Sequence, residues 1–150
     1  MLDRSRIGFE FPVGACRVER GRIKLYAQAI GETDPLYRDV EVARARGYPD
    51  IPIPPGYLYS LDLEREPPID YLGAVGARMG HLLHGEQTLS FFRVICAGTE
   101  IYFHTRIADI YDKRNGTLQF FVVHTRVMDS EQLLVAELRA TFIVPVAQRC

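Results

Sequence analysis

Two carboxylates and a phenol stand within one short stretch of the chain, at Glu32, Asp34 and Tyr37. Carboxylates accept protons and hold water, whereas a phenol with an ordinary pKa of about 10 stays protonated at neutral pH. The three residues therefore form a candidate acid–base set in which Tyr37 donates a hydrogen bond but does not shuttle a proton. The structural alternative is a plain loop, because Asp followed by Pro, as at Asp34, commonly forms a turn.

A second candidate group surrounds the start of an apolar run. Pro55 and Gly56 precede this run, which begins at Tyr57. The N–H of Gly56 can stabilise an oxyanion at a helix amino terminus, and Tyr57 can line an apolar tunnel for a ligand. Equally, Gly56 can simply let a proline-rich chain turn, and Tyr57 can be ordinary core.

A third group lies in a strand-like run. His84 and Glu86 are two residues apart, so a regular strand directs them to one face and Gln87 to the other. His84 and Glu86 can then line a ligand pocket from that face. The alternative is that they form the polar edge of a strand.

The other histidines and the strand arginines give weaker signals. His81 and His84 would face opposite sides of a strand and have no evident third partner, so no metal site is expected. Mid-strand histidines are more often structural than catalytic. Guanidinium groups can bind phosphates, but strand arginines are usually solvated. These residues are His104 and His124, and Arg93, Arg106, Arg126 and Arg139.

Composition limits the classes of partner. The chain has 150 residues, of which 47% are hydrophobic and 25% charged, as in an ordinary globular protein, and we expect one domain over residues 1–150. Its net charge of -1 gives no general attraction for nucleic acid or an anionic membrane. We therefore expect neither of these as a partner.

Cys16, Cys96 and Cys150 are odd in number and far apart, which argues against a disulfide framework or a thiolate zinc site. No apolar run reaches the length of a signal peptide or of a membrane-spanning helix. The cytoplasm is the expected location.

Helix signals concentrate before residue 80. Apolar positions repeat with helical spacing through residues 19–30, and Gly31 stands where a left-handed cap belongs. Asp39 can cap a short helix over 40–46. A proline-rich stretch follows, and the apolar run over 57–63 predicts a buried central helix. Residues 69–80 are expected to form a loop with one helical turn.

Strand signals dominate the rest of the chain, as runs rich in β-branched and aromatic residues over 84–95, 100–112, 117–128 and 133–146. Asn115-Gly116 and Asp129-Ser130 predict hairpins between the last three runs. With an early strand over 7–13, the pattern predicts an α+β fold in which an antiparallel sheet covers the central helix.

Several segments resemble the MaoC-like hydratase and dehydratase family, in particular its amino-terminal FAS1-like dehydratase domain. The resemblance spans roughly residues 7–144. It rests on the stretch from Tyr26 to Asp39, which resembles the hydratase-2 signature, and on Ala43-Arg-Ala-Arg-Gly47, Pro54-Pro-Gly56, His84-Gly-Glu-Gln87, Ala97-Gly98 and Leu134-Val-Ala-Glu-Leu-Arg-Ala-Thr141. It implies a single hot-dog domain, usually dimeric or doubled, acting on acyl groups carried by coenzyme A or acyl carrier protein. It implies no cofactor beyond that carrier.

The resemblance also implies an Asp–His pair that this chain lacks. Glu32 stands at the position of the Asp, Tyr37 at that of the His, and Asp34 at a position that is often Asn. Pro55-Gly56 replaces the His-Gly that commonly opens the central helix.

Three functions remain open at this point. The chain can be a hydro-lyase that interconverts 2-enoyl and 3-hydroxyacyl thioesters, with Glu32 as base, the Gly56 N–H at the oxyanion and Tyr37 or His84 as proton donor. It can be an acyl-thioester-binding subunit, as a homodimer or in a heteromer whose MaoC-like partner carries the intact pair. A hot-dog thioesterase is the third possibility.

Overall fold

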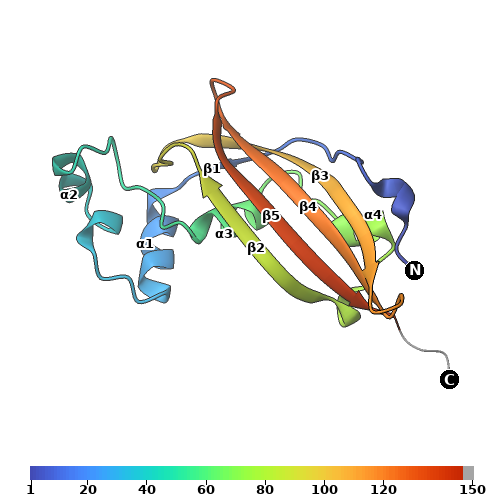
Figure 1. The fold of residues 1–150 in the computed structure, drawn as a ribbon. Coiled ribbons are helices and arrows are strands. Elements are labelled where there is room, and N and C mark those ends of the chain that lie inside the picture. The colour runs from blue at the N-terminus through green and yellow to red at the C-terminus, as the bar shows by residue number, and fades with distance from the viewer. Residues whose placement is uncertain (147–150) are drawn as a thin grey trace.

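The computed structural model describes residues 1–146, except for the side chain of His81. Its helical segments are short, and all of them precede the long strands (Figure 1). They are η1 (Arg4–Arg6), α1 (Arg20–Ala29), η2 (Pro35–Tyr37), α2 (Val40–Ala45), α3 (Tyr57–Glu64), α4 (Tyr71–Val75) and η3 (Met79–His81). One short strand, β1, lies among these helical segments, between η1 and α1.

Five antiparallel strands form one sheet in the order β1-β3-β4-β5-β2. They are β1 (Gly14–Arg17), β2 (Leu83–Phe91), β3 (Glu100–Lys113), β4 (Leu118–Asp129) and β5 (Leu134–Pro145). Both predicted hairpins are confirmed. Asn115 and Gly116 adopt positive φ angles of 54° and 82° in the first turn. In the second, the Asp129 carboxylate accepts a hydrogen bond from the N–H of Leu133 at 2.9 Å.

The core lies between one face of the sheet and α3. Leu58 and Leu61 of α3 are fully buried and pack in one cluster with inward-facing residues of the strands, such as Phe103, Val127 and Leu138. A second cluster lies under α4, where Leu72 and Val75 pack with Ile107, Phe121 and Phe142. The predicted α+β class and the central helix are therefore confirmed.

The predicted early strand over 7–13 is wrong, because β1 begins only at Gly14. Gly8 adopts a φ of +87°, and Pro12 has no N–H to donate, so a regular ladder cannot run through this segment. Single contacts replace the ladder. The N–H of Phe11 donates to the carbonyl of Thr105 at 2.9 Å, and Glu10 forms an isolated bridge with Arg106.

Two further ranges differ from expectation. The predicted strand over 84–95 ends at Phe91, because the N–H groups of Phe92 and Arg93 both donate to the carbonyl of Val135 and the pairing stops there. Residues 69–80 hold two helical segments, α4 and η3, rather than a loop with one turn. The N–H of Gly73 donates to the Asp70 carboxylate at 2.7 Å, which caps α4.

Both ends of the described chain lie beside the β3–β4 turn (Figure 1). The N–H of Leu2 donates to the side chain of Gln119 at 2.8 Å, and the N–H of Val146 donates to the carbonyl of Thr117 at 2.9 Å. Helices α1 and α2 lie at the opposite end of the sheet.

Candidate acyl-binding site

The loop that carries the candidate acid–base residues starts where α1 ends. Gly31 adopts the predicted left-handed conformation, with a φ of +72°, and the N–H of Glu32 donates back to the carbonyl of Ala27 at 2.8 Å. The chain then turns through η2 into α2. The local sequence thus fixes the direction in which the loop leaves the helix.

Both carboxylate oxygens of Asp34 are engaged in holding this loop. One accepts the N–H of Leu36 at 2.9 Å and caps η2, and the other accepts a guanidinium N–H of Arg46 at 2.8 Å. The hydrogen bond from Arg46 and then that from Leu36 hold the pKa of Asp34 below its ordinary value. Asp34 is therefore a structural anchor between η2 and the end of α2.

Glu32 is less constrained than Asp34. Its Oε1 accepts the N–H of Asp34 at 2.9 Å, while no hydrogen bond among residues 1–146 engages Oε2. Burial raises the pKa of Tyr37, and the charges of Glu32 and Asp34 raise it further. The phenol of Tyr37 thus holds its proton more firmly than usual.

Tyr37 and Pro55 line a hollow of about 370 Å³. Its walls come from η2, from the proline-rich stretch and from the segment that follows β2. They are mostly apolar and comprise Leu36, Tyr37, Tyr48, Pro52, Ile53, Pro55, Phe91, Phe92, Arg93, Val94 and Ile95. No imidazole or carboxylate belongs to this lining among the residues that the structure describes.

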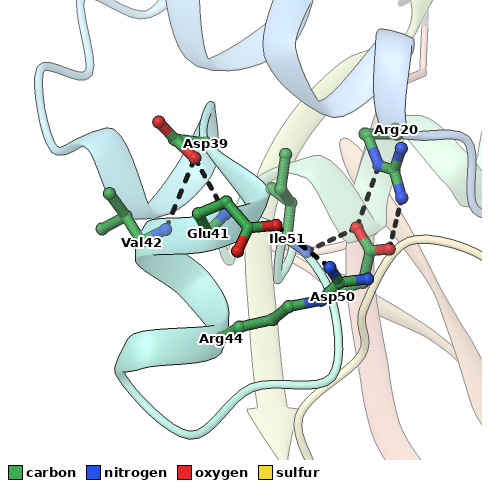
Figure 2. Close-up of polar contacts among 7 residues, drawn as sticks. All are labelled: Arg20, Asp39, Glu41, Val42, Arg44, Asp50 and Ile51. Carbon is green, nitrogen blue, oxygen red and sulfur yellow. Dashed lines mark hydrogen bonds and ion pairs between the residues drawn. The ribbon is translucent and has the colours of Figure 1, made fainter.

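The proline-rich wall is fixed to its surroundings at several points. Asp50 accepts two hydrogen bonds from Arg20 at the start of α1, at 3.1 and 2.6 Å (Figure 2). The N–H of Ile53 donates to the carbonyl of Ile95 at 2.9 Å, which joins this wall to the segment after β2.

Helix α2 is fixed at its own start. As predicted, Asp39 caps it, accepting from the N–H of Glu41 at 2.8 Å (Figure 2). Because η2, α2 and the proline-rich stretch are each tied down by side-chain hydrogen bonds, the hollow is formed without a ligand.

Gly56 and Tyr57 lie at the start of α3. None of the hydrogen bonds among residues 1–146 uses the N–H of Gly56, so it is free to donate. A Cβ at this position would lie 2.6 Å from the hydroxyl of Tyr26, so any larger residue requires the Tyr26 ring to shift. The sequence did not indicate this contact between Tyr26 and Gly56. Helical spacing marks Tyr26 only as one residue on the apolar face of α1.

Tyr57 points away from the hollow that Tyr37 lines. It is 3% exposed and its ring lies 5.0 Å from that of Tyr26. Burial raises its pKa to about 12. It borders a separate hollow of about 280 Å³ with Arg22 and Glu64. Within one chain, Tyr57 therefore packs in the core and does not line the apolar hollow.

The predicted orientation of His84 and Glu86 is wrong. The β2–β5 register shifts between these two residues, so that His84 pairs with Phe142 and Glu86 with Thr141. The extra residue of this β-bulge, Gly85, reverses the alternation of faces. His84 therefore lies on the same face of the sheet as Phe142, exposed, with its ring 5.0 Å from that of Phe142. Glu86 lies on the opposite face.

His84 also lies far from Tyr37. The hollow begins at Phe91, and a strand rises about 3.3 Å per residue, so the seven steps from His84 to Phe91 span roughly 23 Å. Within one chain, Tyr37 and Pro55 share the hollow, and Glu32 and Asp34 lie near Tyr37 but outside the lining. His84 and Glu86 do not join them. Tyr48 also lines the hollow. In the sequence it is notable only as the residue before Pro49.

The lining suits an apolar ligand. The polar groups at the hollow are two phenols, of Tyr37 and Tyr48, and the guanidinium of Arg93. Among residues 1–146, no group of three or more His, Cys, Asp or Glu side chains is placed to bind a metal ion. Within the same range, no helix combines the length and hydropathy needed to cross a membrane.

A family model described as "FAS1-like, dehydratase domain region" matches residues 5–138. The chain belongs to this family. A UPF0336 protein from Saccharopolyspora erythraea is 32% identical to it over 143 residues, which is 95% of this chain and 90% of that protein. The predicted membership among MaoC-like dehydratases is confirmed.

Solved structures confirm the hot-dog fold of this FAS1-like dehydratase region. The HadBC (3R-hydroxyacyl-ACP dehydratase) complex of Mycobacterium tuberculosis matches with a TM-score of 0.78 at 20% identity, over 92% of this chain and 96% of that one. The ChsH1-ChsH2 complex of the same organism matches with a TM-score of 0.76 at 18% identity, over 93% of this chain and 92% of that one.

Proposed function

We propose that this chain binds the acyl part of an acyl thioester as one subunit of a two-chain hydratase or dehydratase. The observation that carries this proposal is the apolar hollow between η2 and the end of β2. It is large enough for an acyl chain, and it holds Tyr37 where the family resemblance implies a histidine. A binding surface is therefore present without the imidazole that would move protons.

The partner subunit, in this proposal, supplies the Asp–His pair. Interconversion of 2-enoyl and 3-hydroxyacyl thioesters needs a base, an acid and stabilisation of an enolate, and no cofactor beyond the thioester carrier. Tyr37, whose pKa is raised, keeps its proton and can donate a hydrogen bond to the bound thioester. The HadBC and ChsH1-ChsH2 structures are complexes of two differently named subunits, which supports a paired arrangement.

A second candidate is catalysis by this chain alone. It is favoured by Glu32, which keeps one carboxylate oxygen without a hydrogen bond, and by the unused N–H of Gly56. Glu32 would act as the base and Gly56 would stabilise the oxyanion. No such observation favours thioesterase action.

Calorimetry with octanoyl-CoA tests the binding half of the proposal. We expect saturable binding that Phe92→Glu abolishes, because a carboxylate would be buried against an acyl chain. Leu133→Glu is the matched control, since Leu133 is also exposed but lies next to the β4–β5 turn. Absence of binding at millimolar ligand, or equal loss in both variants, would contradict an acyl site in this hollow.

Hydration of crotonyl-CoA tests the catalytic half. Alone, the chain should turn over at least about 1000-fold more slowly than an enzyme with an intact acid–base pair. Ordinary rates would overturn the partner proposal. In that event, Glu32→Gln should abolish the activity, and Tyr37→Phe should cost only about 1 kcal/mol, as expected for a lost neutral hydrogen bond. Release of free thiol instead of hydration would indicate a thioesterase.

A further inference from the structure

The outer face of the sheet, opposite α3, carries an ordered array of charged side chains that the acyl site does not use. Residues that pair across antiparallel strands lie on the same face. One row therefore runs through Glu10, Arg106, His124 and Arg139, each paired with the next across β3, β4 and β5. The neighbouring row runs through His104, Arg126 and Glu137.

Two hollows lie along these rows. The first has a volume of about 340 Å³ and is lined by Glu10, Phe11, Val13, His104, Thr105, Arg106, His124 and Arg126. The second, of about 210 Å³, is lined by Thr88, Ser90, His124, Glu137, Leu138 and Arg139. His124 belongs to both linings, so the two hollows lie next to each other on this face. We refer to the two hollows together as the outer groove.

The charges of the outer groove are incompletely paired. Within residues 1–146, no carboxylate lies within 4.0 Å of the guanidinium groups of Arg106, Arg126 or Arg139. The closest contact between a basic and an acidic side chain in these hollows is that of His124 Nε2 and Glu137 Oε2, at 3.7 Å. Glu10 is exposed and faces Arg106 without forming an ion pair.

A buried polar atom at the same place also lacks a partner. Nε2 of His104 is buried and forms no hydrogen bond among the described residues. Buried nitrogens of this kind are nearly always satisfied, because leaving one unpaired loses the hydrogen bond it made with water. The His104 side chain lines the first hollow, so a small shift of its ring would expose this nitrogen to a ligand oxygen there.

We propose that the outer groove binds a small molecule through a phosphate group. Guanidinium forks match the geometry of phosphate oxygens, and two of them, Arg106 and Arg126, line the first hollow beside His104. The second hollow extends the groove toward Arg139 and gives room for a further phosphate or for the body of the ligand. Three guanidinium groups along the groove, those of Arg106, Arg126 and Arg139, favour a diphosphate over a single phosphate, and the carboxylate of Glu10 reduces this preference.

This proposal does not rest on the acyl site. The residues lining the outer groove and those lining the apolar hollow have no member in common. Coenzyme A carries phosphates itself, so an octanoyl thioester of pantetheine, which has none, separates the two sites. Failure of one ligand to bind leaves the other result intact.

Calorimetry with inorganic diphosphate and with ADP, at low salt, tests the outer groove. We expect saturable binding that Arg106→Gln with Arg126→Gln weakens at least about tenfold, since each lost hydrogen bond is to a charged group. Arg78→Gln with Arg114→Gln removes the same net charge from exposed sites elsewhere and should change the affinity less than about twofold. Binding by ADP but not by diphosphate would identify a nucleotide rather than the free anion as the ligand.

Amide chemical shifts supply the second measurement. Diphosphate should perturb the amides of residues 104–106 and 124–126 and leave those of 48–55 unchanged. The proposal is overturned by any of three results: no saturable binding of either ligand, equal weakening in both double variants, or shifts confined to the apolar hollow.

Discussion

Glu32 and Asp34 carry the same functional group, two residues apart, and the structure employs them differently. Asp34 uses both oxygens to hold η2 and α2 in place, whereas Glu32 keeps one oxygen free of hydrogen bonds with residues 1–146. Residue type could not separate these roles. The difference depends on Arg46, which reaches Asp34 only because α2 folds back along the loop.

A glycine at position 56 is favoured by the limited space beside it and not by its backbone conformation. It has an ordinary helical φ of -64°, but a Cβ would lie 2.6 Å from the Tyr26 hydroxyl. We expect Gly56→Ala to destabilise the fold by about 1–3 kcal/mol through overpacking. In a Tyr26→Phe background most of this cost should vanish, because the next ring atom is 3.7 Å from the added carbon.

Urea unfolding of the four variants in this cycle measures the effect. Gly21→Ala is a matched control, since a Cβ there meets nothing within 4 Å, and it should stabilise α1 by about 0.5–1 kcal/mol. Equal loss for Gly56→Ala in both backgrounds would show that the Tyr26 hydroxyl is not the cause.

At the scale of elements, local rules predicted most of the sheet and the helix caps. The strands β3, β4 and β5 lie within one residue of their predicted ranges, because turns such as Asn115-Gly116 fix their ends. The bulge at Gly85 was not predictable, since an added residue breaks the period of two on which strand patterns depend. For the same reason the candidate pair His84 and Glu86 was misplaced. The hollow itself depends on long-range packing of three separate segments, which no local pattern encodes.

The two arginine anchors of the α1–α2 region predict how it responds to acid. Hydrogen bonds from Arg46 and Arg20 hold the pKa values of Asp34 and Asp50 below the ordinary 3.8. An acid with a lowered folded pKa stabilises the fold when ionised. This stabilisation is fully present above the ordinary pKa and is lost as the pH falls through the lowered values.

Unfolding free energies measured between about pH 6 and pH 2 should therefore decline less steeply in Arg20→Gln and Arg46→Gln than in the unaltered protein. Arg114→Gln, at an exposed turn, is the control and should follow the unaltered protein. Parallel curves for all four proteins would mean that neither ion pair contributes.

At the scale of the whole molecule, the unpaired edge of β2 is the main feature left open. Strand β2 pairs only with β5 and lies at the end of the sheet. Leu83, Phe92 and Val94, in and just after this strand, are 55%, 56% and 61% exposed. Open edges invite pairing with another chain, and exposed apolar residues favour it.

We expect the protein purified alone to be a homodimer that uses this edge. Light scattering should give twice the chain mass, and amides of residues 83–91 should exchange more slowly as the protein concentration rises. A monomer at all concentrations would contradict the association. A dimer without protection in β2 would place the contact elsewhere.

The ends of the described chain lie beside the β3–β4 turn and away from α1 and α2. This position determines how the protein can be attached to a surface for binding measurements. A tag joined at the amino end would stand at the pole opposite the apolar hollow. Protein captured on a sensor surface through such a tag would thus present the hollow to the flowing solution. Surface-based kinetics of acyl ligands should then agree with calorimetry, without correction for blocked sites.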